Sequence, residues 1–241
     1  MFTGLSAGWN PREYTAADGS ILQFQIHMPS VIEAGKEYPL IIYMHGAGSK
    51  RDDNTHIHSP HAHFLRKFEC SEEREHVILL APGCPRNGGW VQHRDKPQTE
   101  FNFDIAPTVQ MQAVMELLDR TVAELPIDEK RLYLHGGSMG AHATWELLAR
   151  FPGRFAAAIP MCGCGDPSAA AKKLATAIWI FHGDVDELVP YECSVKMHAA
   201  LLAAGHTNVR FTTIEGGPHG IGRAVTDTEG LMDWLLAQRL G

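Results

Sequence analysis

The amino-acid sequence predicts an α/β protein built on a mostly parallel, doubly wound sheet, and three observations lead to this prediction. From residue 40 onward, short apolar runs that end at Gly, Pro or His recur along the chain. Segments with a helical pattern of apolar residues lie between these runs. Before residue 39 the pattern differs, and it predicts an antiparallel hairpin in the same sheet. Because continuous apolar strands indicate a sheet covered on both faces, we expect parallel strands joined by crossover helices.

The first strands are predicted from alternation. Residues 21–28 alternate apolar and polar side chains, as a half-exposed strand does, and Asp18-Gly19 marks a turn before them. We expect a strand around residues 12–16 to pair with residues 21–28 as a hairpin. The buried parallel strands are predicted at residues 40–44, 77–81, 131–135, 156–161, 177–181 and 209–214.

Three long helices are predicted between or after these strands. Residues 108–125 place apolar side chains on one stripe, and Pro126 ends the helix. Residues 192–204 end at Gly205, a suitable C-cap. Residues 226–239 form the last predicted helix.

The connections indicate a single domain without a cap. The segment 162–176 has room for one short helix at residues 168–174, and not for an inserted cap domain. No internal repeat or linker-like tract interrupts the chain. We therefore expect one domain over residues 1–241, with residues 1–38 as a hairpin region of the same sheet.

The net charge and the hydropathy of the chain limit the kinds of molecule that it is expected to bind. The net charge of −7 offers no electrostatic attraction for nucleic acid, and no apolar run approaches the ~18 residues that a membrane helix needs. We expect a small-molecule substrate rather than nucleic acid or a membrane, and the oligomeric state is left open. The first residues lack the basic and apolar regions of a signal peptide, so we expect a cytoplasmic protein, or a secreted one if a leader was removed.

Cysteines and histidines form no metal or redox motif. The five cysteines include no C-x-x-C pair, and we expect them to be buried or half-buried thiols. Residues 56–63 hold four histidines, a density that can indicate metal binding. However, Pro60 interrupts them and no carboxylate motif accompanies them. We therefore expect a solvated loop that leads into a helix, no metal and no cofactor.

The main chemical motif is G-x-S-x-G at residues 136–140. A predicted strand precedes it and a helical pattern follows, which is the context of a nucleophile elbow. The turn holds Ser138 in a strained backbone conformation, and Gly136 and Gly140 are needed because side chains there would collide. The alternative is an ordinary glycine-rich turn between a strand and a helix.

Two further loops at predicted strand ends supply an acid and a base in the chain order Ser, Asp, His. After the strand at 177–181, both Asp184 and Asp186 are candidates for the acid, and we favour Asp186 because it lies further into the loop. Both aspartates can instead be turn-formers. After the last strand, His219 stands in a loop rich in Gly and Pro, where it can act as the general base.

Backbone amides near these loops complete the candidate site. The strand at 40–44 leads to His45-Gly46-Ala47-Gly48, and the N–H groups of Ala47 and Met139 are the favoured oxyanion donors, with Gly48 as the alternative to Ala47. We expect His45 to brace the loop. Trp90, in the long crossing at 83–104, and Gly48 are candidate substrate-pocket residues; Trp90 can equally be a tryptophan packed over the sheet edge.

Several motifs recur in one known superfamily. They are His45-Gly46-Ala47-Gly48 followed by Asp52-Asp53-Asn54, residues 136–140, His182-Gly183 with Asp186 and Val189-Pro190, and Gly217-Pro218-His219. On these motifs the chain resembles an α/β-hydrolase, and within that superfamily the small serine esterases related to polyhydroxybutyrate depolymerases, prolyl-oligopeptidase catalytic domains and dienelactone hydrolases. One departure is Ile221-Gly222-Arg223, where relatives often carry an aromatic residue.

These features predict a serine esterase that cleaves short-chain acyl or aryl esters through an acyl-enzyme. Ser138 attacks the ester carbonyl, His219 acts as base and then acid, and Asp186 orients His219. The short acyl preference follows from the expected lack of a cap over the site. The alternatives are a serine peptidase or acylaminoacyl hydrolase of prolyl-oligopeptidase type, and a catalytically silent binding module on the same fold.

Overall fold

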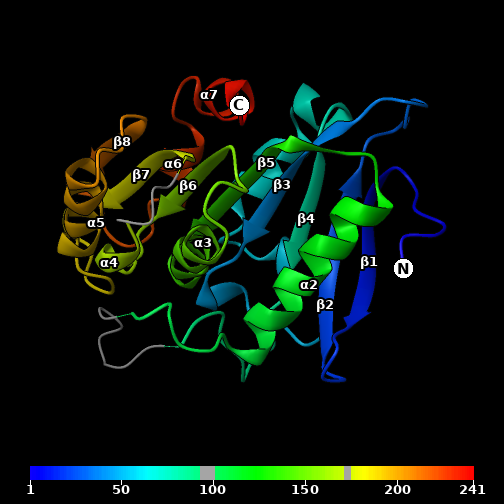
Figure 1. Cartoon of the computed structure of the whole chain (residues 1–241), viewed down its shortest axis with the longest axis horizontal. Coiled ribbons are helices and arrows are strands. Elements are labelled where there is room, and N and C mark those ends of the chain that lie inside the picture. The colour runs from blue at the N-terminus through cyan, green and yellow to red at the C-terminus, as the bar shows by residue number, and fades with distance from the viewer. Residues whose placement is uncertain (93–100, 171–174) are drawn as a thin grey trace.

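A computed structural model describes residues 1–92, 101–170 and 175–241, which form an eight-stranded sheet (Figure 1). The strands are β1 (Gly8–Thr15), β2 (Ile21–Met28), β3 (Tyr38–Met44), β4 (Ile78–Pro82), β5 (Ile127–Gly137), β6 (Ala157–Met161), β7 (Ala177–Gly183) and β8 (Val209–Ile214). Their spatial order is β1-β2-β4-β3-β5-β6-β7-β8. The pairs β1–β2 and β2–β4 are antiparallel, and the remaining pairs are parallel. The predicted α/β-hydrolase fold, a mostly parallel sheet with an N-terminal antiparallel hairpin, is confirmed.

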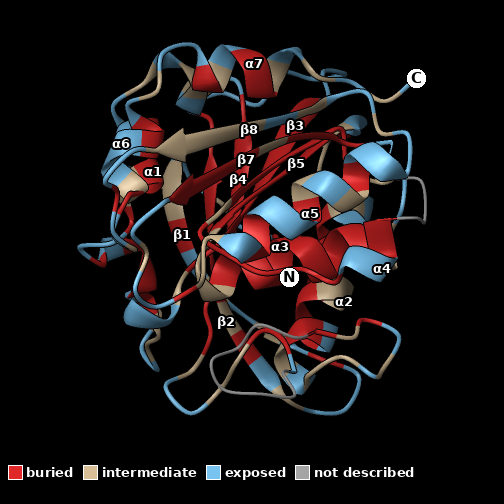
Figure 2. Ribbon diagram, turned by 90° about the vertical axis from the view of Figure 1, so that its left-hand side faces the viewer, coloured by how far each residue is buried: buried red, intermediate tan, exposed pale blue. Residues whose placement is uncertain are grey.

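Helices cover both faces of the sheet (Figure 1). One apolar layer lies against α2 (Val109–Glu124), α3 (Met139–Arg150) and α5 (Glu192–Ala203), and the other lies against α1 (His63–Glu69), α6 (Gly222–Thr226) and α7 (Leu231–Ala237). The inner strands are buried and the edge strands β1 and β8 are less so (Figure 2). A further short helix is α4 (Pro167–Ala170), and short 3-10 turns lie at Ala47–Ser49, His56–His58 and Glu72–Glu75.

Strand β3 shows why its sequence is apolar throughout. Leu40 and Ile42 belong to the apolar cluster on one face of the sheet, and Ile41 and Tyr43 to the cluster on the other. Successive side chains of a strand point to opposite faces, so a strand covered on both sides is apolar at every position. The continuous apolar runs therefore identified the inner strands correctly.

The C-terminal helix differs from the prediction. Of the helix expected at residues 226–239, only residues 231–237 are helical, as α7; α6 already ends at Thr226, and Gly230, with φ of 70°, directly precedes α7. A right-handed helix does not pass through positive φ, and glycine takes this conformation without a steric penalty. Part of the short helix predicted at residues 168–174 is α4; the rest of it, and residues 93–100 of the long crossing, lie outside the described residues.

The expectation that the cysteines are buried or half-buried thiols is wrong for three of the five, Cys70, Cys164 and Cys193. Cys164, after β6, and Cys193, in the first turn of α5, form a disulfide with a Cα–Cα distance of 4.8 Å. Cys84 and Cys162 are buried thiols and Cys70 is exposed. The disulfide joins two segments that follow neighbouring strands, a proximity that depends on the assembled sheet and not on spacing in the chain. Among the described residues, no helix has the length and hydropathy of a membrane span.

Candidate active site

Ser138 lies in the tight turn between β5 and α3, with φ of 56° and ψ of −122°. Two glycines make this turn possible. A Cβ atom on Gly136 would overlap the carbonyl oxygen of Gly140, and one on Gly140 would overlap the carbonyl oxygen of Met44. The Ser138 amide donates to the Met161 carbonyl at 2.8 Å, which anchors the turn to β6. The strained serine and the steric need for both glycines agree with the sequence analysis.

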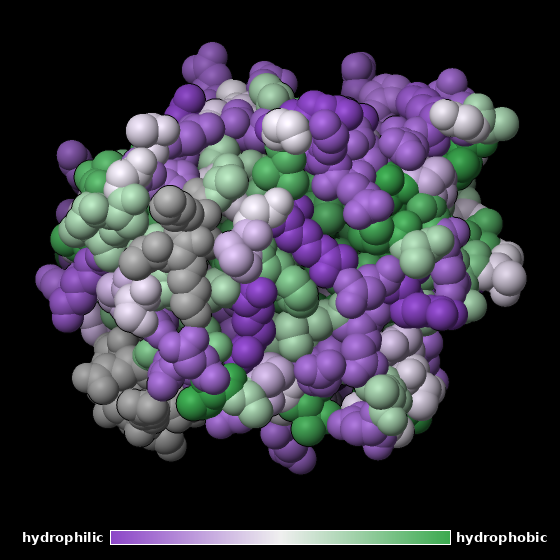
Figure 3. Space-filling view, in the orientation of Figure 1, coloured by the Kyte–Doolittle hydropathy of each residue, from purple (hydrophilic) through white to green (hydrophobic). Residues whose placement is uncertain are grey.

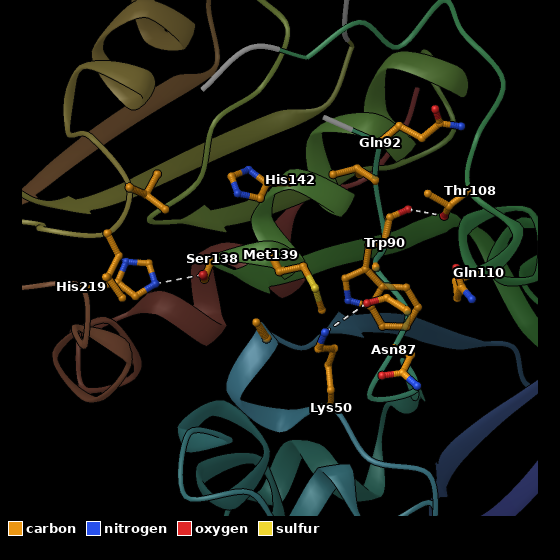
Figure 4. A pocket seen from close by; sticks show the side chains of 16 residues that line it. Lys50, Asn87, Trp90, Gln92, Thr108, Gln110, Ser138, Met139, His142 and His219 are labelled. Carbon is orange, nitrogen blue, oxygen red and sulfur yellow. Dashed lines mark hydrogen bonds between the residues drawn. The ribbon is translucent and has the colours of Figure 1, made fainter. Parts of the chain in front are cut away.

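The loops after β7 and β8 bring Asp186 and His219 to Ser138. His219 Nε2 lies 2.9 Å from Ser138 Oγ, and His219 Nδ1 lies 2.7 Å from Asp186 Oδ2. Figure 4 shows the His219 ring directed at Ser138. A Cβ atom on Gly183 would overlap the carbonyl oxygen of Gly217, so the two loops meet backbone to backbone. Asp184, the competing aspartate, is exposed.

The carboxylate of Asp186 is inaccessible to solvent and richly hydrogen-bonded. Its Oδ1 accepts from the amides of Leu188 at 2.9 Å and Val189 at 2.8 Å. Burial by itself raises the pKa of this carboxyl, but hydrogen bonds from His182, from His219 and from these two amides outweigh burial. The pKa of Asp186 is therefore held far below its usual range, and the group stays ionised beside His219 at neutral pH.

The turn after β3 packs directly on the turn that contains Ser138. A Cβ atom on Gly46 would lie 3.5 Å from Ser138 Cβ. Ala47 follows at the start of a 3-10 turn, and Met139 is the first residue of α3, where amides have no acceptor within the helix. Both residues line the cavity that contains Ser138. Ala47 and Met139 thus line the space beside the Ser138 hydroxyl from two elements.

His45 holds this turn in place. Its Nδ1 donates to the Gly46 carbonyl at 2.8 Å, and its Nε2 accepts from the Cys84 amide at 2.9 Å. Burial lowers the pKa of His45 to about 3, so the ring is neutral and its two nitrogens keep these distinct roles. The side chain therefore braces the loop, the role that the sequence analysis expected.

Two cavities meet at Ser138, and both are lined by Ala47, Leu188 and His219 as well. The larger cavity has a volume of about 820 Å³, and the smaller one has a volume of about 430 Å³. Polar side chains are spread over the face shown in Figure 3, with apolar patches between them. The larger cavity is also lined by Lys50, Asn87, Gln92, Thr108 and Gln110 (Figure 4), and the smaller one by Tyr43, Phe64, Met161, His61 and His63.

The two predicted pocket residues fall in different cavities. Trp90 lines the larger cavity, but it is 0% exposed and its Nε1 donates to the His45 carbonyl at 2.9 Å. Gly48 lines the smaller cavity, where a Cβ atom would lie 2.9 Å from the His61 ring. Trp90 therefore supports the loop that precedes Ala47, and Gly48 leaves room for His61.

The histidine-rich segment 56–63 is only partly solvated. It leads into α1 as expected, and His58 and His61 are exposed. His56 is buried against that expectation, and its Nε2 donates to the Ala81 carbonyl at 2.9 Å. At least one of the four histidines of this segment therefore has a structural role, since its buried ring is hydrogen-bonded to the backbone of β4.

The sequence analysis did not identify one group of side chains that includes Asp186. Potential metal-ligand atoms of Cys162, His182 and Asp186 lie within 4.8 Å of one another. Hydrogen bonds already engage the His182 ring and the Asp186 carboxylate, so the group is a hydrogen-bond cluster and not an open set of ligands. The sequence analysis named His182 only as part of the motif shared with the α/β-hydrolases. Neither the burial of its side chain nor its hydrogen-bond partners can be predicted from residue spacing along the chain.

Comparisons with known proteins agree with the fold. The model of the phospholipase/carboxylesterase family matches residues 27–228. The bifunctional acetylxylan esterase/xylanase XynS20E of Neocallimastix patriciarum is 24% identical over 180 residues, which are 75% of this chain and 24% of that protein. The solved structure of a thermostable esterase is 29% identical with a TM-score of 0.86, over 96% of this chain and 63% of that one.

More distant structures share the fold. A ferulic acid esterase, 14% identical, has a TM-score of 0.70 over 97% of this chain and 99% of that one. The acylaminoacyl peptidase of Pyrococcus horikoshii, also 14% identical, has a TM-score of 0.66 over 97% of this chain and 42% of that one. This chain spans about a quarter of the curated relative's length and under two thirds of the thermostable esterase. Since the family model matches residues 27–228, which are most of this chain, the chain belongs to the phospholipase/carboxylesterase family.

Proposed function

We propose that this chain is a serine hydrolase that cleaves carboxylic esters, of short-chain acyl or aryl type, through an acyl-enzyme. Ser138, His219 and Asp186 are the catalytic residues of this proposal. The observation that carries it is the His219 ring, which is bonded to Ser138 Oγ at 2.9 Å on one side and to Asp186 Oδ2 at 2.7 Å on the other. This is the arrangement that activates a serine hydroxyl.

In the first half of the reaction, His219 Nε2 takes the proton of Ser138 Oγ as this oxygen bonds to the ester carbonyl carbon. The carbonyl oxygen becomes an oxyanion, which the amides of Ala47 and Met139 stabilise. His219 then gives the proton to the departing alcohol oxygen. In the second half, His219 activates a water molecule that attacks the acyl-enzyme, and the acid leaves as Ser138 regains its proton. Asp186, which stays ionised, stabilises the charged imidazole throughout.

The substrate class is part of the proposal. Esters are favoured over peptides because the relatives at 24% and 29% identity are named as esterases, whereas the acylaminoacyl peptidase shares the fold at 14% identity. The two cavities beside Ser138 suit an ester with one group on each side of the carbonyl. The larger cavity is open to solvent and lined partly by amide and amine side chains, so a long acyl chain in it would stay partly exposed to water.

A hydrolysis panel tests this function. We expect turnover of p-nitrophenyl acetate and butyrate, with kcat/KM falling beyond six to eight carbons, and much slower cleavage of peptide p-nitroanilides. Aryl acyl and acetylated-sugar esters are included to locate the natural class. Ser138→Ala is the matched control, and its activity should fall to background, about 10⁶-fold in a comparable serine hydrolase. A maximum at ten carbons or longer, or faster cleavage of anilides than of esters, would contradict the proposed substrate class.

A further inference from the structure

Behind Asp186 lies a buried polar chain that the proposed reaction does not use. His182, at the end of β7, is 0% exposed and stands four residues before Asp186. Its Nε2 lies 3.0 Å from the Val189 carbonyl oxygen and 3.2 Å from Asp186 Oδ2. Its Nδ1 lies 2.6 Å from the Oγ of Ser194, which is buried in the first turn of α5. Every ring nitrogen of this histidine therefore has a partner.

The partners determine which nitrogen of His182 carries the proton. A backbone carbonyl and a carboxylate are acceptors only, so Nε2 carries the hydrogen, which it donates to the Val189 carbonyl while Asp186 Oδ2 lies 3.2 Å from the same nitrogen. In the neutral ring Nδ1 is then an acceptor, and the Ser194 hydroxyl donates to it. A hydroxyl on α5 thus selects the tautomer in which His182 donates toward Asp186.

His182 is one of several groups that surround the Asp186 carboxylate. Oδ1 is occupied by the amides of Leu188 and Val189. Oδ2 is shared by His219 and His182, which approach it at 2.7 Å and 3.2 Å. The thiol of Cys162 lies within 4.8 Å of the same carboxylate. Because both oxygens are held, the carboxylate cannot rotate away from His219 without breaking a buried hydrogen bond.

We propose that His182 is a positioning residue that holds the Asp186 carboxylate toward His219, and that Ser194 enables it by fixing its tautomer. The inference rests on the proposed function, since it assigns a task to Asp186. The competing role for His182 is a hydrogen-bonded core histidine that contributes to stability alone. A stabilising role would lower the folded fraction and leave the turnover of the folded enzyme unchanged.

The test uses variants that remove or keep the donor. His182→Leu removes it, whereas His182→Gln can place an amide N–H near the position of Nε2. Ser194→Ala removes only the hydroxyl that selects the tautomer. His27→Gln is the matched control, because His27 is a buried histidine on β2 that packs between the rings of Trp9 and Phe68, away from the site.

We expect His182→Leu to lower kcat by about 10- to 100-fold, the usual range for loss of a hydrogen bond to a charged group. KM should change little, because His182 is not among the residues that line either cavity. His182→Gln should recover part of kcat, and Ser194→Ala should lower kcat by less than His182→Leu. Adding Ser194→Ala to His182→Leu should cause no further loss, since both act through one hydrogen bond.

Active-site titration with a fluorophosphonate gives the concentration of competent enzyme, so that kcat refers to folded molecules. A wild-type kcat in both His182→Leu and Ser194→Ala overturns the proposal, as does a glutamine variant as slow as the leucine variant. If His182→Leu does not fold, Ser194→Ala decides alone, and an unchanged kcat overturns the proposal. Failure of the proposed function would look different: Ser138→Ala would keep wild-type turnover.

Discussion

The Cys164–Cys193 disulfide permits a quantitative prediction. The bond closes a loop over a sequence separation of 29 residues. In the chain-entropy model, a loop of this length stabilises the folded state by about 3.6 kcal/mol, because cross-linking restricts the unfolded chain. For a chain of 241 residues each kcal/mol shifts Tm by roughly 2–4 °C, so loss of the bond should lower Tm by about 7–14 °C.

The measurement compares thermal and urea unfolding of three samples: the oxidised protein, the protein with excess dithiothreitol, and the double variant Cys164→Ala/Cys193→Ala. The reduced protein and the double variant should lose similar free energies of unfolding. Cys70→Ala is the control, because Cys70 is an exposed free cysteine and its replacement should change stability by less than about 0.5 kcal/mol. Dithiothreitol that leaves Tm unchanged, or five reactive thiols in the unfolded, unreduced protein, would refute the account.

Three further predictions test other parts of the account. Asp186→Asn should lower kcat by about 10⁴-fold, because the wrong His219 tautomer is then favoured, while Asp184→Asn should keep most activity; the reverse result in steady-state assays would move the role to Asp184. Stability should fall on acidification below pH 6.5, because burial lowers the pKa of His45 to about 3 and of His56 and His135 to about 4. The unfolded chain binds these protons first, so stability is complete above pH 6.5 and is lost toward pH 4, by about 1.4 kcal/mol per pH unit for each ring. Urea midpoints that do not change from pH 7.5 to 5.5 would contradict this. Gly140→Ala should abolish activity and destabilise the fold, since the added methyl group meets the Met44 carbonyl; a variant with wild-type Tm and kcat would show that the turn can relax.

The inner sheet and the nucleophile turn were predictable because their signals are local. The apolar runs mark strands buried on both faces, and the glycines at 136 and 140 are required by contacts of the turn itself. The preference for Asp186 over Asp184 also used local information, namely how far each residue lies into the loop. In the structure it is Asp186 that contacts His219.

The remaining features depend on contacts between distant segments. Cys164 and Cys193 meet because β6 and β7 are neighbours in the sheet, and their spacing in the chain does not reveal this. The partners of His182 follow from the same folding, which brings α5 back against the end of β7. Gly230 is different: it lies inside the segment predicted as a helix, and a glycine there is a recognisable local sign that the helix begins only after it.

Covalent labelling of Ser138 tests the central claim most directly. A fluorophosphonate bonds to a serine oxygen only where a neighbouring base activates it and amides receive the phosphoryl oxygen. The intact mass should rise by one phosphonyl group, and tandem mass spectrometry of the peptide that contains residues 132–150 should place it on Ser138. Ser138→Ala should not label, and His219→Ala should label far more slowly than the wild type. An unlabelled wild-type protein, or a label on another residue, would contradict the proposal that this chain is a serine hydrolase acting through Ser138.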